Sequence, residues 1–309
     1  MSRVSTTGNY QSALLNLMAA QQQQADASTR VSTQKNATDL TGFGRSSETL
    51  TALKAASSRV QGFLDTGEVV GARLEAQDLA LNQIIDGVGG ARAAIAGVLS
   101  SGSAGTLMLE LEGQFQSVTG GLNAQHQGGY LFGGANTTQQ PVGVTTLSNL
   151  AAAPTVAGTF NNDTIKPVSR VAENTSIETG YLASDLGSTI FQIFKDIKAY
   201  NDNSATGPLS GKPTEAQKTF LTAQLSRLDA AKTSAVDTAA RNGSLQKRIE
   251  QIDLSHTAQQ TSLDEMVSNR TDADPFKAVT DLQLSQIAVQ ASAQVISQLR
   301  DVSLLNYLR

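Results

Sequence analysis

The residues of this chain that could do chemistry are few, and their spacing builds no active site. The sequence has two histidines, His126 and His256, and no cysteine. Without cysteine there are no disulfides, thiolate zinc sites or cysteine nucleophiles. Two histidines far apart in sequence supply neither a metal ligand set nor a hydrolase triad. We therefore expect no enzyme activity, no metal ion and no cofactor, and we interpret His256 as a hydrogen-bonded packing residue.

Two further patterns resemble ligand sites only in part. Residues 207–212 read Gly-Pro-Leu-Ser-Gly-Lys, which has too few residues between the glycines for a phosphate-binding loop. Pro213 also stands where that loop needs Ser or Thr. The acidic residues at 264–265 and 272–274 do not fit the spacing of a calcium loop. We interpret the first segment as a turn and the acidic residues as solvated charge.

The charge balance and the hydropathy pattern exclude two further classes of partner. Lys plus Arg number 23 against 27 Asp plus Glu, a net charge of -4, so there is no basic excess for a nucleic acid. No uninterrupted apolar run approaches the roughly 20 residues of a membrane span. Residues 1–10 contain no apolar run either. We expect no membrane span and no cleaved secretory signal.

Hydrophobic periodicity predicts a mainly α chain of long helices. The clearest series runs in steps of seven from Val60 to Ile95, with a second series three residues later, and only Gly67 and Gln77 interrupt it. A heptad pattern of this length predicts a rod-like helix that packs as a coiled coil. That helix should span about 46–99. Others are expected at about 9–34, 107–124, 184–200, 214–270 and 275–309.

Two segments between these helices carry other patterns. Residues 128–134 place Tyr130, Leu131 and Phe132 between glycine pairs, which suits a short strand or hairpin. From 135 to 183 helical periodicity is absent, and Thr, Val, Asn and Pro dominate. We predict a small β-rich insertion there.

The order of the elements predicts a nested arrangement, because both halves run outward from the termini and back. The expected fold is an elongated, nested helical bundle with a coiled-coil rod. Three domains follow: 1–40 with 275–309 as a terminal coiled coil, 41–136 with 181–274 as a helical core with a β-hairpin, and 137–180 as a small outer domain.

The two terminal helices carry apolar stripes, which predict that another surface packs against them. Terminal residues usually have too few contacts to offset their ordering entropy. The residues alone leave two interpretations open, an intramolecular helix pair or packing between subunits. The side chains expected to pack between subunits are Leu14, Leu17, Val295, Leu299, Val302, Leu305 and Leu308.

The order of several short motifs resembles the flagellin family. These motifs are the opening Met-Ser-Arg-Val-Ser-Thr at 1–6, the Gln-rich segment that ends in Ser-Thr-Gln-Lys at 32–35, the Tyr-Leu-Phe-Gly-Gly at 130–134, and the closing Ser-Leu-Leu-Asn-Tyr-Leu at 303–308. The chain departs from the family at Gln34, where most members have Gly. Asp39 alone stands for the usual Asp-Asp-Pro. This departure concerns the linker between the terminal and core domains.

The resemblance implies a structural subunit of the bacterial flagellum that joins hook to filament, with a filament flagellin as the alternative. It implies self-assembly into a ring or helical layer between an adjoining hook-associated protein and flagellin. It also implies an extracellular location reached through the flagellar type III export apparatus. An export chaperone would hold the C-terminal helix before secretion.

Overall fold

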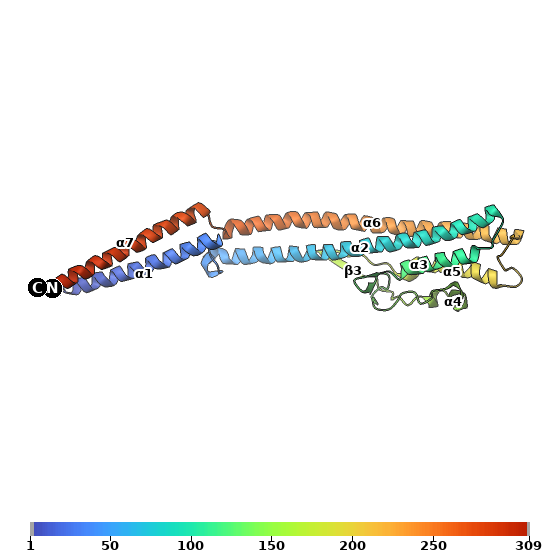
Figure 1. Ribbon diagram of the computed structural model, residues 1–309, viewed down its shortest axis with the longest axis horizontal. Helices are drawn as coiled ribbons and strands as arrows, with labels where there is room; N and C mark the ends of the chain where they lie inside the picture. Colours follow the sequence, from blue (N-terminus) through green and yellow to red (C-terminus); the bar gives the residue numbers. More distant parts are fainter. Residues whose placement is uncertain (1–2, 308–309) are drawn as a thin grey trace. The chain divides into compact units, whose positions relative to one another are not determined.

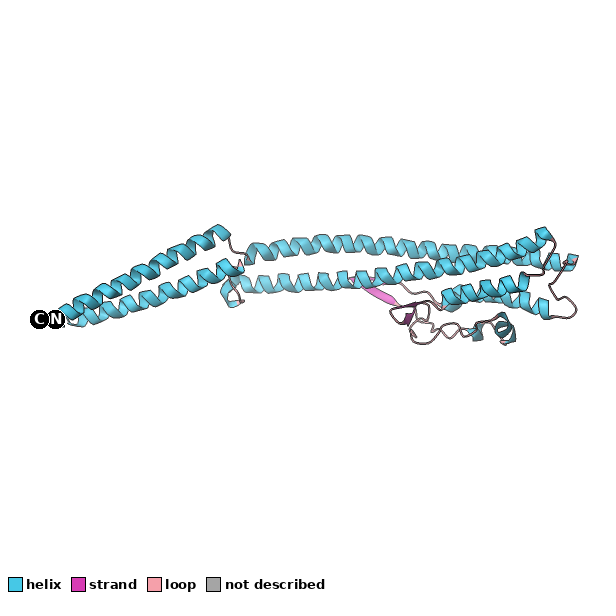
Figure 2. Ribbon diagram, viewed as in Figure 1, coloured by secondary structure: helices cyan, strands magenta, loops and turns pink. Residues whose placement is uncertain are grey.

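The chain folds into two compact units, each described below by itself. The structure, a computed structural model, describes residues 3–307, and it describes the side-chain surroundings of residues 8–300. Unit 1 comprises Met1–Val60 and Ala258–Arg309, and unit 2 comprises Gln61–Thr257. Long helices that pack together make up most of both units (Figures 1 and 2), which confirms the mainly α fold. The finer division into three domains stays a prediction.

Unit 1 is built from the two ends of the chain. It contains α1 (Arg3–Thr33), the short 3-10 helix η1 (Thr41–Ser46) and α7 (Pro275–Tyr307). It also contains the first part of α2 (Ser47–Ser101) and the last part of α6 (Glu215–Thr271). Figure 1 shows α1 and α7 side by side. The linker between α1 and α2 is partly helical, because η1 occupies its second half.

Most residues of the large core of unit 2 come from four helices. These are α2, α3 (Leu107–Leu122), α5 (Ala183–Asp202) and α6. The Phe115 ring centroid lies 5.0 Å from that of Phe191 and 5.5 Å from that of Phe194, and all three rings are fully buried. Edge-to-face and tilted aromatic pairs of this kind contribute about 0.5–1.5 kcal/mol beyond their buried area.

Glycines on α2 let α3 approach it closely. A Cβ added at Gly87 would lie 2.7 Å from Val118 Cγ2, and one added at Gly90 would lie 2.3 Å from Gln114 Oε1. Gly121 of α3 meets the backbone oxygen of Ala80 in the same way, at 2.9 Å. Glycine weakens an isolated helix by about 1 kcal/mol relative to alanine. Here that loss is offset by close packing that no larger residue permits.

The glycine-aromatic segment forms the expected hairpin. β1 (Gln125–His126) pairs antiparallel with β2 (Gly129–Tyr130). The two residues between them, Gln127 and Gly128, have φ angles of 50° and 80°, as a tight two-residue hairpin turn requires. The following Leu131 and Phe132 enter the core.

Residues 135–183 contain strands, as expected of the insertion, and also short helices that the sequence did not predict. The segment includes α4 (Leu147–Ala152), the short η2 (Ala157–Thr159), and the antiparallel strands β3 (Val168–Ala172) and β4 (Thr175–Glu178). Thr146 caps α4, since its side-chain oxygen accepts a hydrogen bond from the Asn149 amide at 3.2 Å. Leu147 and Leu150 join the main core. A helix of six residues is too short to show periodicity in the sequence.

The β3–β4 hairpin packs on the long helices through a second, smaller core. Val171 and Ile177 contact a cluster formed by Val70, Leu74 and Ile249. Two buried polar side chains tie the hairpin down at its edges: Gln77 Nε2 donates to Thr179 O at 3.0 Å, and His256 Nε2 lies 2.9 Å from Val171 O. The Gln77 interruption of the heptad is therefore the point at which the hairpin is held.

One described helix, Thr41–Ser101, is long and apolar enough by length and composition to cross a bilayer, with a mean hydropathy of 1.2 over its best window. A helix in the core of a soluble protein meets the same criteria of length and composition. The residues Leu74, Leu81 and Ile95 of this helix are completely buried in the two cores. The expected absence of a membrane span stays a prediction.

Candidate functional site

The strongest candidate site is the surface of the α1–α7 pair. The buried positions of this pair carry small side chains spaced seven apart: Ala20 and Ala27 on α1, and Ala278 and Ser285 on α7. Leu17 and Leu299 are half-buried. Short side chains let two helices approach closely, and the pair therefore closes without burying its large residues.

The large apolar side chains of this pair remain exposed. Leu14 keeps 42% of its surface exposed and Val295 keeps 48%. Seven more exposed apolar side chains lie on the same two helices: Tyr10, Leu15, Met18, Phe276, Val279, Leu284 and Ile287. Each helix thus has a narrow buried stripe and a second, exposed stripe.

The single stripes expected from the sequence are therefore divided in the structure. Among the predicted packing residues, Leu17 and Leu299 are half-buried and Leu14 and Val295 are exposed. Val302 and Leu305 belong to α7, but their side chains lie outside the described part, and Leu308 lies outside the described residues altogether. The packing role of all seven residues stays a prediction.

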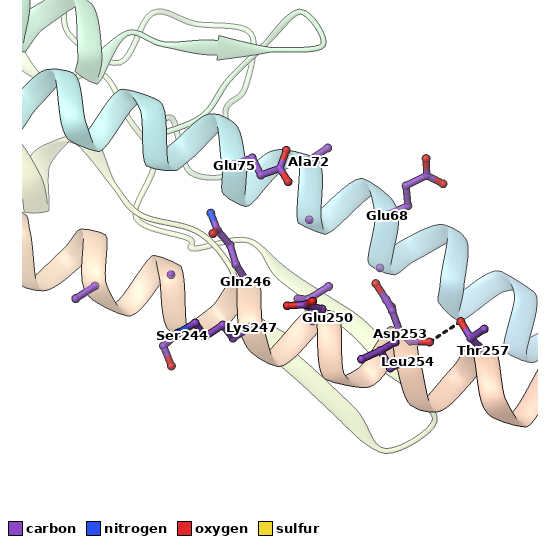
Figure 3. A pocket seen from close by; sticks show the side chains of 15 residues that line it. Glu68, Ala72, Glu75, Ser244, Gln246, Lys247, Glu250, Asp253, Leu254 and Thr257 are labelled. Atoms are coloured by element: carbon purple, nitrogen blue, oxygen red, sulfur yellow. Dashed lines mark hydrogen bonds between the residues drawn. The ribbon is translucent and has the colours of Figure 1, made fainter.

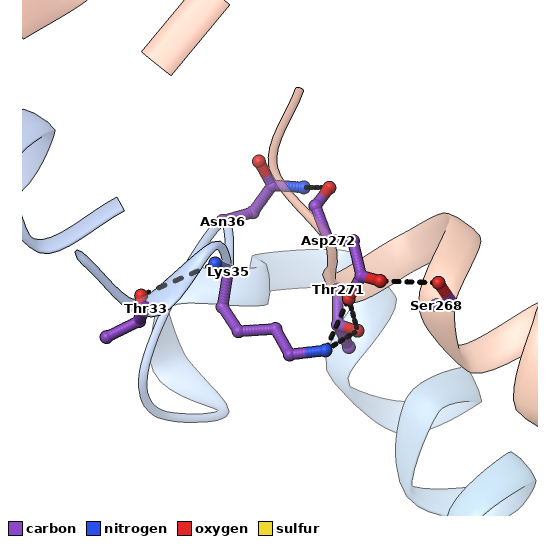
Figure 4. Close-up of polar contacts among 6 residues, drawn as sticks. All are labelled: Thr33, Lys35, Asn36, Ser268, Thr271 and Asp272. Atoms are coloured by element: carbon purple, nitrogen blue, oxygen red, sulfur yellow. Dashed lines mark hydrogen bonds and ion pairs between the residues drawn. The ribbon is translucent and has the colours of Figure 1, made fainter. Parts of the chain in front are cut away.

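A clasp of backbone and side-chain bonds joins the two connections at the base of this helix pair (Figure 4). Lys35 and Asp272 form an isolated antiparallel bridge. The Asn36 amide donates to Thr271 O at 2.7 Å, and the Ala273 amide donates to Gln34 O at 2.9 Å. The α1–α2 connection and the α6–α7 connection are thereby held in register.

Asp272 is the electrostatic centre of this clasp. Its carboxylate pairs with the Lys35 ammonium and accepts hydrogen bonds from the hydroxyls of Ser268 and Thr271. These partners favour the charged form and lower the pKa of Asp272 from its ordinary 3.8 to about 2, with the Lys35 hydrogen bond contributing most. The pair is exposed to solvent, so it specifies the geometry of the connection more than its stability.

The departure from the flagellin pattern at Gln34 has a structural consequence. Gln34 has a φ angle of 56°, in the left-handed region that favours glycine. This is the position at which the resemblance places Gly. Asp39, the remaining acid of the linker, accepts hydrogen bonds from Thr41 Oγ1 at 2.7 Å and from the Gly42 amide at 2.9 Å, which lower its pKa. Asp39 therefore holds the first two residues of η1.

The residues considered for chemistry are placed elsewhere and do not come together. His256 is buried, stacks on Phe63 with ring centroids 5.5 Å apart, and contacts Val171 O, as expected of a packing residue. His126 lies in β1. Among residues 3–307 there is no group of three or more His, Asp or Glu side chains that could hold a metal ion.

Sequence reasoning missed the small-residue stripe of the terminal helices. Its signal is present, because Ala20 and Ala27, like Ala278 and Ser285, recur at heptad spacing. The predicted packing residues are the larger apolar side chains, and of these Leu14 and Val295 lie on the exposed side. The clasp has no comparable signal, since it joins residues more than two hundred positions apart.

Comparisons with known proteins agree with this arrangement. Residues 218–308 match the model of the bacterial flagellin C-terminal helical region. No curated protein matches the chain. Among solved structures, a protein described as a flagellar hook-associated protein from Vibrio parahaemolyticus is similar with a TM-score of 0.58 and 16% identity, and the match covers 73% of this chain and 97% of that one.

FlgL from Bacillus cereus is similar with a TM-score of 0.53 and 15% identity, over 70% of this chain and 97% of that one. At these identities the likeness shows a shared fold. The chain therefore has the fold of a flagellar hook-associated protein, and its C-terminal part is similar to the flagellin C-terminal helical region.

Proposed function

We propose that this chain is a structural subunit of the bacterial flagellum that packs against copies of itself through the α1–α7 pair. The observation that carries the proposal is the exposed apolar stripe on both helices, which includes Leu14 and Val295. Burying one such side chain completely contributes about 1.5–3 kcal/mol. Contiguous apolar surface of this kind marks a protein interaction site. A ring or helical layer would cover it.

Within the flagellum, the role that we propose is that of hook-associated protein 3, the subunit between hook and filament. The Tyr-Leu-Phe-Gly-Gly segment at 130–134 and the short insertion support this role over that of a filament flagellin. Its neighbours would be a second hook-associated protein on one side and flagellin on the other. A filament flagellin remains the alternative function, because the flagellin-type region at 218–308 is common to both.

The route to this location follows from the same proposal. The chain would leave the cell unfolded through the flagellar type III export apparatus and act outside it. An export chaperone would cover the C-terminal helix beforehand, since Leu284, Ile287 and Val295 leave that helix with an exposed apolar side.

Charged residues introduced on the exposed stripe test the proposal that the α1–α7 pair packs against other copies. The double variant Leu14→Asp with Val295→Asp should keep the helix content of the monomer, because both side chains are already largely exposed. It should fail to assemble in sedimentation and electron microscopy. Ser12→Asp with Ala293→Asp is the matched control, since it adds the same charge at exposed positions two residues before Leu14 and Val295, on another side of each helix. Assembly of both variants at the wild-type concentration would refute the proposal.

Immunogold labelling of intact flagella separates the two candidate roles. A junction subunit should be labelled in one narrow band between hook and filament. A filament flagellin should be labelled along the filament, and that result would replace the junction role with the alternative.

A further inference from the structure

Two exposed helix faces of unit 2 carry opposite charges in the same pattern. On α2, Glu68 and Glu75 are seven residues apart, with Gly71 and Ala72 between them. On α6, Arg241 and Arg248 are also seven residues apart, and Ser244 lies between them. All four charged side chains are exposed. Residues seven apart lie on one side of a helix, roughly 10 Å from each other.

The charged side chains of both faces lack ion pairs within the described part of the chain. No ion pair or side-chain hydrogen bond among the described residues involves Glu68, Glu75, Arg241 or Arg248. The described ion pair between α2 and α6 is a different one, Arg92 with Asp229. Glutamates and arginines without a partner on a helix surface are ordinary one at a time. Here two pairs with the same spacing carry opposite charges, and the two faces are therefore complementary.

The α2 face borders an open groove of about 1000 Å³ (Figure 3). Glu68, Ala72 and Glu75 follow one another along α2 at this groove. A Cβ added at Gly71 would meet nothing within 4 Å, so nothing in the chain fills the space beside it. Arg241 lines a separate groove of about 470 Å³ on another side of α6, with Tyr181 and Lys166. Ser244 borders both grooves, but neither Arg241 nor Arg248 lines the groove beside Glu68 and Glu75.

An antiparallel approach of the two faces would match every position. Glu68 would meet Arg248, and Glu75 would meet Arg241. The small residues Gly71 and Ala72 would lie opposite Ser244, which lets the two helices come close enough for the charged side chains to reach each other. Since the arginine pair does not line the groove beside the glutamate pair, this contact joins two molecules.

We propose that the α2 face of one copy, defined by Glu68, Gly71, Ala72 and Glu75, binds the α6 face of a second copy, defined by Arg241, Ser244 and Arg248. The inference rests on the proposed self-assembly and gives it a second, lateral contact. Two different faces form it, so it can repeat from copy to copy and close a ring or extend a helical layer. Its charges select the neighbour and the register, and salt weakens it.

Two charge-reversed chains test this contact. The acidic-face variant combines Glu68→Arg with Glu75→Arg, and the basic-face variant combines Arg241→Glu with Arg248→Glu. Each variant alone presents two faces of the same sign, so its self-association in low salt should be weaker than that of the wild type by roughly tenfold or more. An equal mixture should recover association, because the two variants can alternate. Sedimentation velocity of the full-length chains measures both.

The matched control is Lys232→Glu with Lys247→Glu. It changes the charge of α6 by the same amount, but Lys247 lines the α2-side groove and Lys232 lies beside Gly89 of α2. This control should associate at least as well as the wild type. Circular dichroism and thermal unfolding should show that all variants fold.

The outcomes separate this inference from the proposed function. If the mixture associates no better than either variant alone, the lateral contact is refuted, whatever the wild type does. If the wild type assembles but the Leu14→Asp and Val295→Asp chain assembles equally well, packing through the terminal pair is refuted. Recovery by the mixture, with loss in each variant alone, supports the lateral contact.

Discussion

The two units of this protein bury very different side chains. Unit 2 encloses the large rings of Phe115, Phe132, Phe191 and Phe194, all with less than 2% of their surface exposed. The α1–α7 pair of unit 1 buries alanine and serine and leaves its leucines outside. Apolar burial drives folding in proportion to area. Unit 2 therefore buries its large apolar side chains within itself. The α1–α7 pair instead leaves large apolar side chains exposed, where another molecule can cover them.

The largest expected effect comes from removing a ring of unit 2. Phe191→Ala should destabilise the folded chain by about 3–5 kcal/mol, because it leaves a cavity among Phe115 and Phe160. Leu14→Ala in unit 1 should change the stability of the monomer by less than about 0.5 kcal/mol. Chemical denaturation of both variants measures the difference. Equal losses would show that the monomer depends on both regions alike.

Glycine substitutions sharpen the same comparison inside α2. Gly87→Ala should destabilise the chain by about 1–3 kcal/mol, since the new Cβ would overlap Val118. Gly97→Ala is the matched control, because its Cβ would meet nothing within 4 Å, and it should stabilise the helix by up to about 1 kcal/mol. Thermal unfolding should give opposite signs. The same sign for both would mean that α3 does not pack closely on Gly87.

The Gln34 backbone offers a smaller effect in unit 1. Gln34→Gly should relieve a left-handed conformation and stabilise the α1–α2 connection by about 0.5–1 kcal/mol. Protease resistance of the 34–46 segment would report it. The neighbouring Lys35→Gly is the control and should do the reverse, since it removes the Asp272 partner. A faster cleavage of the Gln34→Gly chain would contradict the conformation described here.

The smallest effect is the pH dependence of the clasp. The pKa of Asp272 is lower in the folded chain, about 2, than its ordinary 3.8, so its contribution is complete above pH 3.8 and is lost as the pH falls towards 2. The melting temperature of the wild type should therefore fall more steeply over this range than that of Asp272→Asn. Asp237→Asn, at an exposed position, should keep the wild-type slope.

Much of this fold could be predicted from the sequence because heptad periodicity continues over long segments. The helix expected at 46–99 is α2, Ser47–Ser101, and the one expected at 214–270 is α6, Glu215–Thr271. The interruption at Gly67 was visible too. The structure explains it, since a Cβ there would lie 2.1 Å from Asp253 Oδ1.

What could not be predicted depends on contacts between distant segments. The six residues of α4 are shorter than two helical turns, and its place in the core is set by Leu147 and Leu150 against other elements. The division of the terminal stripes into buried and exposed sides required the α1–α7 pairing itself. The clasp of Lys35 and Asp272 likewise exists only once both connections are folded.

Amide hydrogen exchange of the dilute and assembled chain tests the central claim most directly. In the dilute monomer, amides of α1 and α7 should exchange much faster than those of α3 and α5, because the terminal pair buries little apolar surface of its own. On assembly, α1 and α7 should become protected while α3 and α5 change little. Full protection of α1 and α7 in the monomer, independent of concentration, would contradict the account.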